Sequence, residues 1–516
     1  MNTAPDMTPE QIVAWLRALA PAAELSSDSR QISAGDVFVA YPGDAADGRQ
    51  FIDDAIERGA VAVLVEADNV SPDRQNAVPM LLVANLKACA GIIASLWYQT
   101  SDADLFSVAV TGTNGKTSCS QWLASALSRL AGPGAVIGTL GTGLFRRGMA
   151  EQFAQTGYTT PDAVLLQRRL RDLQQVGATS LAIEASSIGL DQGRLNGLHV
   201  DVALFTNFTR DHLDYHGDMA AYEAAKTALF DWPGLQHVVL NLDDAMGLRL
   251  LAHVQKTAPQ VAITGYSLHG VGFPGLESVR ATEIRTSHAG TSFQLTTSTG
   301  TMLVKTRLVG NFNVSNVLGI IGVLLGKGHA LRATVDAIEA LTAVPGRMQQ
   351  FGGQDAPLVV IDYAHTPDAL EKTLAALRQV ALQRHGKLWC IFGCGGDRDP
   401  GKRPQMGAVA MAADEVILTS DNPRNEAPEH IIAQTLQGMG SADDGSTTPP
   451  IPQVIEDRAA AILRAVRHAG KADVILLAGK GHENYQEIRG KKLPFLDADH
   501  AALALATRAT SKGSRQ

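Results

Sequence analysis

The residue types and spacing of a phosphate-binding loop occur in one short segment, Gly112-Thr113-Asn114-Gly115-Lys116-Thr117-Ser118. It lies between an apolar run at 105–110 and a helical apolar pattern at 122–130, which predicts a strand, a turn and a helix N-terminus. The N–H groups of such a turn and the positive end of the helix dipole bind anions. Lys116 adds a charge for the outer phosphates, and the Thr117 hydroxyl can ligate magnesium. The segment therefore predicts a nucleoside triphosphate site rather than a plain connecting turn, although Val110 replaces the first glycine of the general P-loop.

Three ionisable residues farther along the chain are candidates for the same site. Glu184 ends a predicted strand at 180–184, where its carboxylate can hold magnesium; the alternative is a glutamate that faces solvent. His212 lies in a segment rich in ligand-type side chains, residues 207–216, and its spacing fits a metal ligand and a solvated helix equally well. Lys226 belongs to an ordinary helical pattern, and the residue types alone predict a lysine that faces solvent.

Polar loops follow four short apolar strands in the last third of the chain. They occupy residues 362–365, 393–398, 421–424 and 479–483, and we expect them to share one site. Arginines gathered at strand ends of a chain with net charge −8 indicate an anionic ligand, the alternative being scattered surface arginines. In the segment Asp421-Asn422-Pro423-Arg424 the proline fixes the turn that aims the acid and the guanidinium. One acid and one guanidinium suit a zwitterionic amino acid.

Strands and helices alternate along the whole chain and must position these residues. This pattern predicts an α/β protein whose central sheet is mostly parallel and doubly wound, with ligands at the carboxyl ends of its strands. We expect three domains, at residues 1–101, 102–346 and 347–516. Thr8, Pro9 and Gln11 predict a capped helix start, and the more polar β-like runs at 280–310 predict a small antiparallel appendage.

Composition restricts the class of protein. The 516 residues are 45% hydrophobic and 19% charged, as in ordinary globular proteins, and the net charge of −8 argues against nonspecific nucleic-acid binding. The four cysteines lack CxxC spacing and form no disulfide framework, which fits a reducing compartment. The N-terminus lacks the features of a signal peptide, and no apolar stretch is long enough for a membrane span. We therefore expect a cytoplasmic protein.

With these residues in view, the chain closely resembles the Mur ligases, which are ATP-dependent amide-forming enzymes of bacterial peptidoglycan precursor synthesis. The resemblance covers roughly residues 24 to 500. It rests on an ordered set of motifs at 28–30, 112–118, 159–160, 184–187, 211–214, 222–226, 311–316, 345–347, 362–365, 395–398, 421–424 and 479–483. The family implies an N-terminal domain for a UDP-linked substrate, a central P-loop-type ATPase domain and a C-terminal Rossmann-like domain for the incoming amino acid.

The resemblance also implies ligands and a role for each matching residue. The substrates would be ATP, UDP-N-acetylmuramoyl-dipeptide and meso-diaminopimelate, the amino acid that accompanies the Asp-Asn-Pro-Arg form, and the enzyme would be a monomer. Magnesium would be ligated by Thr117, Glu184, His212 and Lys226, the last of these carrying a carbamate. ATP would also contact Asn311, Arg347 and Asp362. The uridine nucleotide would contact Ser27, Ser29, Asp44, Ala45 and Ala46. The muramoyl-dipeptide would contact Tyr158, Thr159, Thr160, Ser186, Gln192 and Arg194. The amino acid would contact Arg398, Asp421, Asn422, Pro423, Arg424, Gly479 and Glu483.

Three positions depart from the family pattern. Tyr158 replaces a frequent asparagine, Pro161 a common glycine and Ile188 a common histidine, changes that affect the substrate groove rather than the chemistry. The alternatives are the same reaction with L-lysine, a folylpolyglutamate-synthetase-like ligase, and a nucleotide-dependent regulatory protein. The N-terminal motif at 28–30 and the loop at 421–424 argue against the second, and a set of amino-acid-binding loops would have no purpose in the third.

Overall fold

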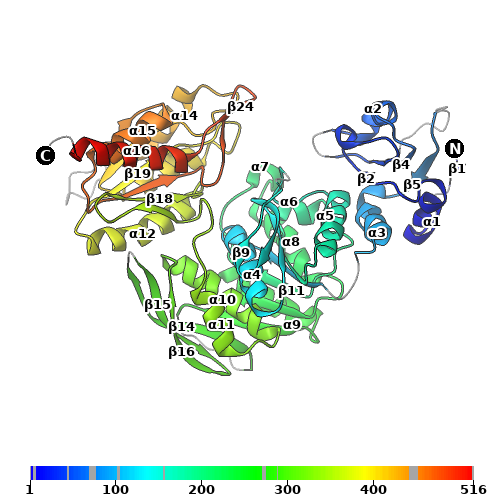
Figure 1. The fold of residues 1–516 in the computed structure, drawn as a ribbon, viewed down its shortest axis with the longest axis horizontal. Coiled ribbons are helices and arrows are strands. Elements are labelled where there is room, and N and C mark those ends of the chain that lie inside the picture. The colour runs from blue at the N-terminus through cyan, green and yellow to red at the C-terminus, as the bar shows by residue number, and fades with distance from the viewer. Residues whose placement is uncertain are drawn as a thin grey trace.

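A computed structural model describes residues 2–3, 7–43, 46–68, 77–100, 105–154, 157–269, 275–287, 289–440 and 451–513. Three α/β units follow one another along the chain (Figure 1), which confirms the predicted fold class. The boundary predicted at 101/102 lies outside the described residues, and the one at 346/347 lies between α11 and β17. Within the described ranges no helix has the length and apolar character needed to cross a membrane.

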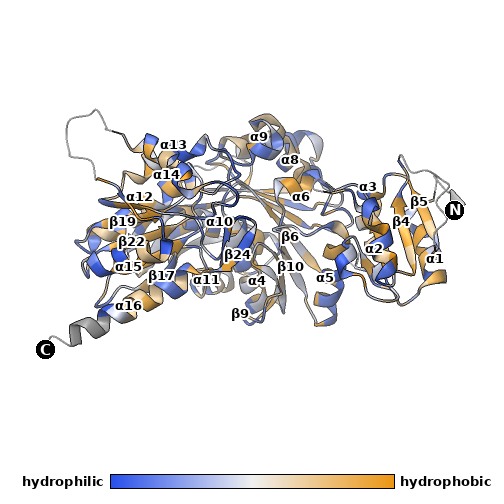
Figure 2. Ribbon diagram, turned by 90° about the horizontal axis from the view of Figure 1, so that it is seen from above, coloured by the Kyte–Doolittle hydropathy of each residue, from blue (hydrophilic) through white to orange (hydrophobic). Residues whose placement is uncertain are grey.

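The N-terminal domain is a parallel sheet in the order β1-β5-β4-β3-β2, with helices packed against it. Its first long helix begins as predicted: Thr8 accepts a hydrogen bond from the Gln11 amide, and the Gln11 side chain accepts one from the Thr8 amide. Figure 2 shows the strands as strongly hydrophobic ribbons, as expected for a sheet that helices cover. The bounds are β1 Asn2–Thr3, α1 Pro9–Leu19, β2 Leu25–Ser26, β3 Val37–Ala40, α2 Ile52–Glu57, β4 Ala62–Glu66, β5 Met80–Val83 and α3 Leu86–Tyr98.

The central domain is built on one long sheet in the order β16-β15-β14-β13-β12-β11-β6-β10-β7-β8-β9. The strands from β14 to β7 in this order are parallel, so their carboxyl ends meet at one edge. The strand bounds are β6 Phe106–Thr111, β7 Gly134–Gly138, β8 Gly141–Arg146, β9 Met149–Ala150, β10 Ser180–Glu184, β11 Val202–Phe205, β12 His237–Asn241, β13 Ala262–Ser267, β14 Glu277–Ser287, β15 Gly290–Thr297 and β16 Gly300–Thr306. The helix bounds are α4 Lys116–Leu130, α5 Ala163–Gln175, α6 Ser187–Asp191, α7 Leu213–His216, α8 Met219–Thr227, α9 Ala245–Thr257, α10 Asn311–Gly326 and α11 Leu331–Glu339.

The predicted appendage at 280–310 is wrong in one respect. Strands β14, β15 and β16 are antiparallel to one another, as expected. However, β14 pairs in parallel with β13, so these strands extend the central sheet instead of forming a separate unit.

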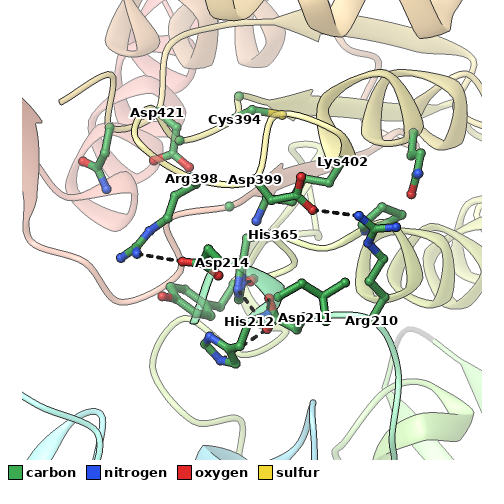
Figure 3. Close-up of a pocket in the computed structure, with 18 of the residues that line it drawn as sticks. Arg210, Asp211, His212, Asp214, His365, Cys394, Arg398, Asp399, Lys402 and Asp421 are labelled. Atoms are coloured by element: carbon green, nitrogen blue, oxygen red, sulfur yellow. Dashed lines mark hydrogen bonds and ion pairs between the residues drawn. The ribbon is translucent and has the colours of Figure 1, made fainter. Parts of the chain in front are cut away.

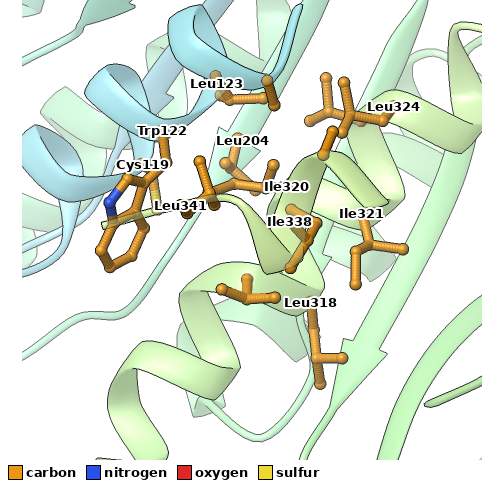
Figure 4. Close-up of a cluster of buried hydrophobic side chains, with 14 of the residues drawn as sticks. Cys119, Trp122, Leu123, Leu204, Leu318, Ile320, Ile321, Leu324, Ile338 and Leu341 are labelled. Carbon is orange, nitrogen blue, oxygen red and sulfur yellow. The ribbon is translucent and has the colours of Figure 1, made fainter. Parts of the chain in front are cut away.

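Helices α4, α10 and α11 pack on one face of the central sheet and fix the helix that starts at the phosphate-binding segment. Figure 4 shows Leu123 of α4 beside Leu204 of β11 and side chains of α10, and Trp122 of α4 beside Leu341. Trp122 also donates its indole N–H to the Thr342 carbonyl at 2.8 Å. Because Leu123 and Leu204 are fully buried, each contributes about 1.5–3 kcal/mol relative to an exposed side chain.

The C-terminal domain has a sheet in the order β17-β18-β22-β19-β20-β21, parallel except for the edge strand β17. A hairpin of β23 and β24 follows β22 and bridges to the loop after β20 through Arg424 and Ile488. The strand bounds are β17 Gln349–Gly352, β18 Leu358–Asp362, β19 Leu388–Phe392, β20 Glu415–Leu418, β21 Gln453–Val454, β22 Val474–Ala478, β23 Tyr485–Ile488 and β24 Lys491–Pro494. The helix bounds are α12 Pro367–Gln383, α13 Lys402–Ala410, α14 Pro428–Leu436, α15 Arg458–His468 and α16 Asp497–Gly513.

Candidate active site

The phosphate-binding segment joins β6 to α4, as the sequence predicted. Gly112 and Gly115 have φ values of 143° and 91°, which favour glycine. A Cβ on Gly112 would lie 1.9 Å from the Thr206 hydroxyl oxygen, so this position has no room for a side chain. Lys116 donates from Nζ to the carbonyls of Gly112 and Thr113 at 2.8 and 2.9 Å. The backbone of the loop therefore surrounds the ammonium group of Lys116 at the start of a helix, and this geometry favours the binding of anions.

Glu184 ends β10 beside this loop and is almost fully buried. Its Oε2 accepts hydrogen bonds from the hydroxyls of Thr117 (3.0 Å) and Thr139 (3.1 Å), and its Oε1 accepts one from the Thr139 amide (2.7 Å). The structure thus excludes the alternative of a glutamate that faces solvent. A buried carboxylate next to a threonine hydroxyl is a pair of hard oxygen ligands.

The residues of this site fit a magnesium ion that is bound together with a nucleotide. Within the described ranges, no three His, Cys, Asp or Glu side chains form a metal-binding cluster. Magnesium typically uses one or two protein carboxylates together with substrate phosphates. Glu184 and Thr117 beside a phosphate-type loop match that pattern, because together they offer one carboxylate and one hydroxyl.

His212 follows β11 on the same edge of the sheet and has a left-handed φ of 53°. Burial lowers its pKa to about 4, and Lys116 and Lys226 oppose its protonation further. A neutral imidazole is the form that ligates metals. Its neighbour Asp211 lies 4.0 Å from Nε2 of His365, a residue of the C-terminal domain. Although burial raises the pKa of Asp211, His365 and His212 bring it down to about 2.

Lys226 is buried, although the residue types around it predict a lysine that faces solvent. Its predicted place on a solvent-facing helix surface is wrong, since the side chain is 1% exposed. Nζ donates to the Gly112 carbonyl at 2.9 Å and lies 4.6 Å from the centre of the Tyr222 ring. Burial, followed by the charge of Lys116, lowers the pKa of Lys226 well below its ordinary value. The helical pattern gave no sign of this, because α8 packs its Lys226 side against the phosphate loop.

A chain of polar contacts leads from Glu184 to the residues assigned to the muramoyl-dipeptide. Thr160 is fully buried, and its hydroxyl donates to the Glu184 carbonyl and contacts the Ser186 hydroxyl at 2.9 Å. Thr159 accepts a hydrogen bond from Thr139. The structure therefore gathers these residues at the same strand end as Glu184, while their contact with substrate stays a prediction.

Arg194 continues this polar chain away from the phosphate loop. Its guanidinium donates to the Gln192 side chain at 2.8 Å and to the Thr160 carbonyl at 2.9 Å. It also lies 5.5 Å from the ring centre of Tyr158, which is 58% exposed. Tyr158, which departs from the family pattern, thus lies over the guanidinium of Arg194, whose contact with substrate stays a prediction. Ile188, another departure from the family pattern, lines the neighbouring cavity.

The residues assigned to the uridine nucleotide lie in the N-terminal domain. Ser27 donates from its hydroxyl to Asp162, the capping residue of α5, at 2.8 Å and so connects the two domains. Ser29 is buried in a short 3-10 helix, and Ala46 accepts a hydrogen bond from Gly43. Asp44 and Ala45 lie outside the described residues.

Arg347 brings the C-terminal domain to the phosphate loop. Its guanidinium donates to the Thr117 hydroxyl at 3.3 Å and lies 4.3 Å from the ring centre of Tyr363. Asp362 is buried, which raises its pKa, and accepts a hydrogen bond from the Met348 amide. Asn311 is exposed at the start of α10, and its contact with ATP stays a prediction.

A cavity of about 370 Å³ lies between the loop after β11 and the strand-end loops of the C-terminal domain (Figure 3). The lining includes Asp421, Asn422, Arg424, Gly479 and Glu483, which confirms that these sequence-distant residues meet. From the central domain it includes Arg210, Asp211, His212, Leu213 and Asp214. The cavity is therefore shared by two domains, and one wall belongs to the segment that follows β11 of the central sheet.

Two reciprocal ion pairs cross this cavity. Arg398, predicted to contact the amino acid, pairs with Asp214 at 3.6 Å, and Arg210 pairs with Asp399 at 3.2 Å (Figure 3). Arg424 has a φ of 51° and donates to the Gly396 carbonyl at 2.6 Å. Arg398 and Arg424 both line the cavity, as the sequence predicted. Each already has a partner within the protein, Asp214 for Arg398 and the Gly396 carbonyl for Arg424.

Several residues at the site escaped the sequence predictions. Asn207 clamps the backbone of Asn114 through its amide oxygen (2.9 Å) and amide nitrogen (3.0 Å). Asn316 lies so close to Gly115 that a Cβ there would meet its Oδ1 at 2.6 Å. Both lie within motifs that the sequence analysis had singled out, at 207–216 and 311–316. Asp211 and His365 lie 4.0 Å apart at the cavity and belong to the segments 207–216 and 362–365, but the sequence predicted no separate role for either residue.

Comparison with known proteins follows the same division of the chain. Three family descriptions match successive segments: Mur ligase family, catalytic domain at 22–96; Mur ligase middle domain at 110–324; and Mur ligase, glutamate ligase domain at 346–481. The chain is 65% identical to the UDP-N-acetylmuramoyl-L-alanyl-D-glutamate–2,6-diaminopimelate ligase of Janthinobacterium sp. (strain Marseille), over 96% of this chain and 97% of that protein. It is 51% identical to the ligase of the same name from Ralstonia nicotianae, over 96% of each chain. A solved structure of a ligase of that name matches with a TM-score of 0.65 and 37% identity, over 94% of this chain and 95% of the other.

Proposed function

The chain belongs to the Mur ligase family of ATP-dependent, amide-forming enzymes, and we propose that it adds meso-2,6-diaminopimelate to UDP-N-acetylmuramoyl-L-alanyl-D-glutamate. The amide forms at the D-glutamyl γ-carboxylate, a step of peptidoglycan precursor synthesis. We further propose that the enzyme acts in the cytoplasm as a monomer.

One observation carries this proposal: the phosphate loop and the amino-acid cavity meet at a single domain boundary. Asn114 of the phosphate loop donates at 3.3 Å to Asp368 of the C-terminal domain, a residue that lines the cavity, and Arg347 of the same domain donates to Thr117 at 3.3 Å. A ligase that activates a carboxylate and then transfers it to an amine needs these two sites side by side. A nucleotide-dependent switch has no use for the second.

In the first step, an oxygen of the γ-carboxylate attacks the γ-phosphorus of ATP, the bond to the β-phosphate oxygen breaks, and ADP leaves. Two anions must approach each other, so this chain has to offset their repulsion. Lys116 and Arg347 supply positive charge from opposite domains, and the loop amides after Gly112 hold the phosphates. Thr117, Glu184 and His212 would hold magnesium, which lowers the negative charge of the phosphates when bound.

Lys226 is proposed to carry a carbamate. Its buried amine has a lowered pKa, and the neutral amine is the form that adds carbon dioxide. The modification would replace a cation with an anionic oxygen ligand for magnesium. Lys226 lies against the Gly112 carbonyl and near His212, whose pKa the charge of Lys226 helps to lower.

In the second step, the amine of diaminopimelate attacks the acyl phosphate carbon, loses a proton, and phosphate leaves as the amide forms. Asp421, Asn422 and Glu483 suit the ammonium group of the amino acid, and Arg424 suits its distal carboxylate. Because the cavity is bounded by both domains, their closure shields the acyl phosphate from water.

The test is phosphate release from ATP with UDP-muramoyl-dipeptide present and diaminopimelate or L-lysine offered in parallel. We expect release that depends on the amino acid and strongly favours diaminopimelate. A preference for lysine would overturn the role of Arg424, and release with a folate and glutamate instead would favour a folylpolyglutamate-synthetase-like ligase. Nucleotide binding without amino-acid-dependent release would favour a regulatory protein.

A further inference from the structure

Lys480 is a fully buried cation next to the amino-acid cavity. It follows Gly479 at the end of β22, and its side chain is 0% exposed. Its ammonium group donates to Glu483 Oε2 at 2.9 Å, Asn422 Oδ1 at 3.0 Å and Asp421 Oδ1 at 3.4 Å. A lysine ammonium has three N–H donors, so each donor has an oxygen acceptor.

All three acceptors belong to residues that line the cavity, whereas Lys480 is not among the described lining residues. Asp421 and Glu483 each offer Lys480 one carboxylate oxygen. Among the described residues, the other oxygens, Asp421 Oδ2 and Glu483 Oε1, accept no hydrogen bond. The lysine therefore holds two carboxylates while leaving one oxygen of each for a ligand.

Lys480 also fixes the orientation of the Asn422 amide. The amide oxygen accepts from Lys480 and from the Glu487 backbone at 2.9 Å. The amide nitrogen consequently points at Glu483 Oε2, 2.7 Å away. Lys480, Asn422 and Glu483 are therefore hydrogen-bonded to one another in all three pairs, so each side chain restrains the other two.

The charge of Lys480 determines which charge of ligand can bind at the side of the cavity formed by Asp421 and Glu483. Two carboxylates close together in a buried place repel each other, and a cation between them offsets this repulsion. With Lys480 present, the three charged groups sum to a net charge of −1, which suits a single ammonium group. Without Lys480, the repulsion would displace Asp421 or Glu483 from the position in which its carboxylate can bind the ammonium group of the ligand.

We propose that Lys480 is a positioning residue that sets the affinity of this ligase for the ammonium group of its amino-acid substrate. It acts through Asp421, Asn422 and Glu483 and touches neither ATP nor the muramoyl-dipeptide. This inference rests on the proposed function, because it takes the cavity to be the amino-acid site.

The test compares the full-length enzyme with Lys480→Met, which keeps the length of the side chain and removes its charge. Steady-state kinetics give KM for diaminopimelate, ATP and UDP-muramoyl-dipeptide. Hydroxylamine, which captures an activated carboxyl group as a hydroxamate, reports the first step without any amino acid. Lys387→Met is the matched control, because Lys387 is an exposed lysine of the same domain that pairs with Glu415.

In Lys480→Met we expect KM for diaminopimelate to rise about 30-fold or more, since loss of one partner from a buried charge pair is costly. KM for the other two substrates and the hydroxamate rate should stay unchanged. An unchanged KM for diaminopimelate would overturn the inference, and so would a parallel loss of all parameters, which indicates a merely structural role. If Lys480→Met does not fold, Lys480→Gln takes its place with the same expectations. Absence of hydroxamate with the unaltered enzyme would instead overturn the proposed function itself.

Discussion

The phosphate loop and the amino-acid cavity are built in opposite ways. The loop is one run of seven residues, and Lys116 bonds to carbonyls only three and four positions away. The cavity draws its walls from segments that lie between residues 188 and 483. The phosphate loop thus takes much of its shape from its own backbone, with Asn207 and Asn316 packed against it, whereas the cavity is formed only when a scaffold holds distant loops in place.

Buried charges provide that scaffold in the C-terminal domain. Arg403, with a side chain 2% exposed, bonds to the Gly395 carbonyl and to both oxygens of Glu426, which joins the loops after β19 and β20. The ion pair of Arg458 and Asp497 is fully buried and bonds to the Ala478 carbonyl at the end of β22. Removing one partner of such a pair is strongly destabilising, because the other is left as an uncompensated charge. We therefore expect loop substitutions to affect chemistry, and scaffold substitutions to affect stability and amino-acid binding.

The largest effect is expected in the phosphate loop. Lys116→Ala should lower kcat by about 10³-fold, because a charge that stabilises the transferring phosphoryl group is lost. Thermal unfolding should change little, since the loop is held by its glycines and by α4. Lys256→Ala, at an exposed position near the end of α9, is the control. Near-normal ligation by Lys116→Ala would show that the loop is not the phosphate site.

A somewhat smaller loss is expected at Lys226, which belongs to the same site but was visible only in three dimensions. Lys226→Met should lower activity about 100-fold, as for other changes around metal ligands. Because the lowered pKa keeps more of the amine neutral, the unaltered enzyme should lose activity in buffer free of carbon dioxide and regain it with bicarbonate. Carbon-13 NMR with labelled bicarbonate should show a carbamate signal that is absent in Lys226→Met. Full activity without carbon dioxide would contradict the carbamate.

In the cavity, Arg424→Ala should act on amino-acid binding rather than on ATP. We expect KM for diaminopimelate to rise about 30-fold, because a bidentate guanidinium–carboxylate pair is lost. KM for ATP should not change, and the preference for diaminopimelate over lysine should shrink. Equal effects on both amino acids would mean that Arg424 does not contact the distal carboxylate.

The smallest effect concerns the scaffold. The hydrogen bonds from Arg403 hold the pKa of Glu426 at about 2, below its ordinary 4.5. Its contribution to stability is therefore fully present above pH 4.5 and is lost as the pH falls toward 2. After solvent screening we expect Glu426→Gln to lower the free energy of unfolding by about 1–2 kcal/mol at pH 7.

Thermal unfolding at pH 7 and pH 3 measures this contribution. The difference between Glu426→Gln and the unaltered enzyme should shrink at pH 3, where the glutamate of the unfolded chain is already protonated. Glu429→Gln, at an exposed position in the first turn of α14, should show no such difference. A difference that is equal at both pH values would rule out a role for the carboxylate charge.

The sequence by itself determined the fold class, the phosphate loop and the strand ends that carry polar side chains. These follow from short-range rules: the alternation of apolar strands and helices, the need for glycine at positive φ, and the rule that parallel strands end at one edge. Asp421, Arg424 and Glu483 could be assigned to one site for the same reason, before any contact between them was known.

Only the tertiary structure decided which charges are buried and what they face. A helical pattern cannot tell that Lys226 turns toward Gly112, nor can a loop motif tell that Lys480 holds Asp421 and Glu483 together. Burial and pKa depend on the atoms that surround a group, and here those atoms come from parts of the chain that lie 59 and 114 residues away. For the same reason the pairing of Arg398 with Asp214 across the domain boundary could not be predicted.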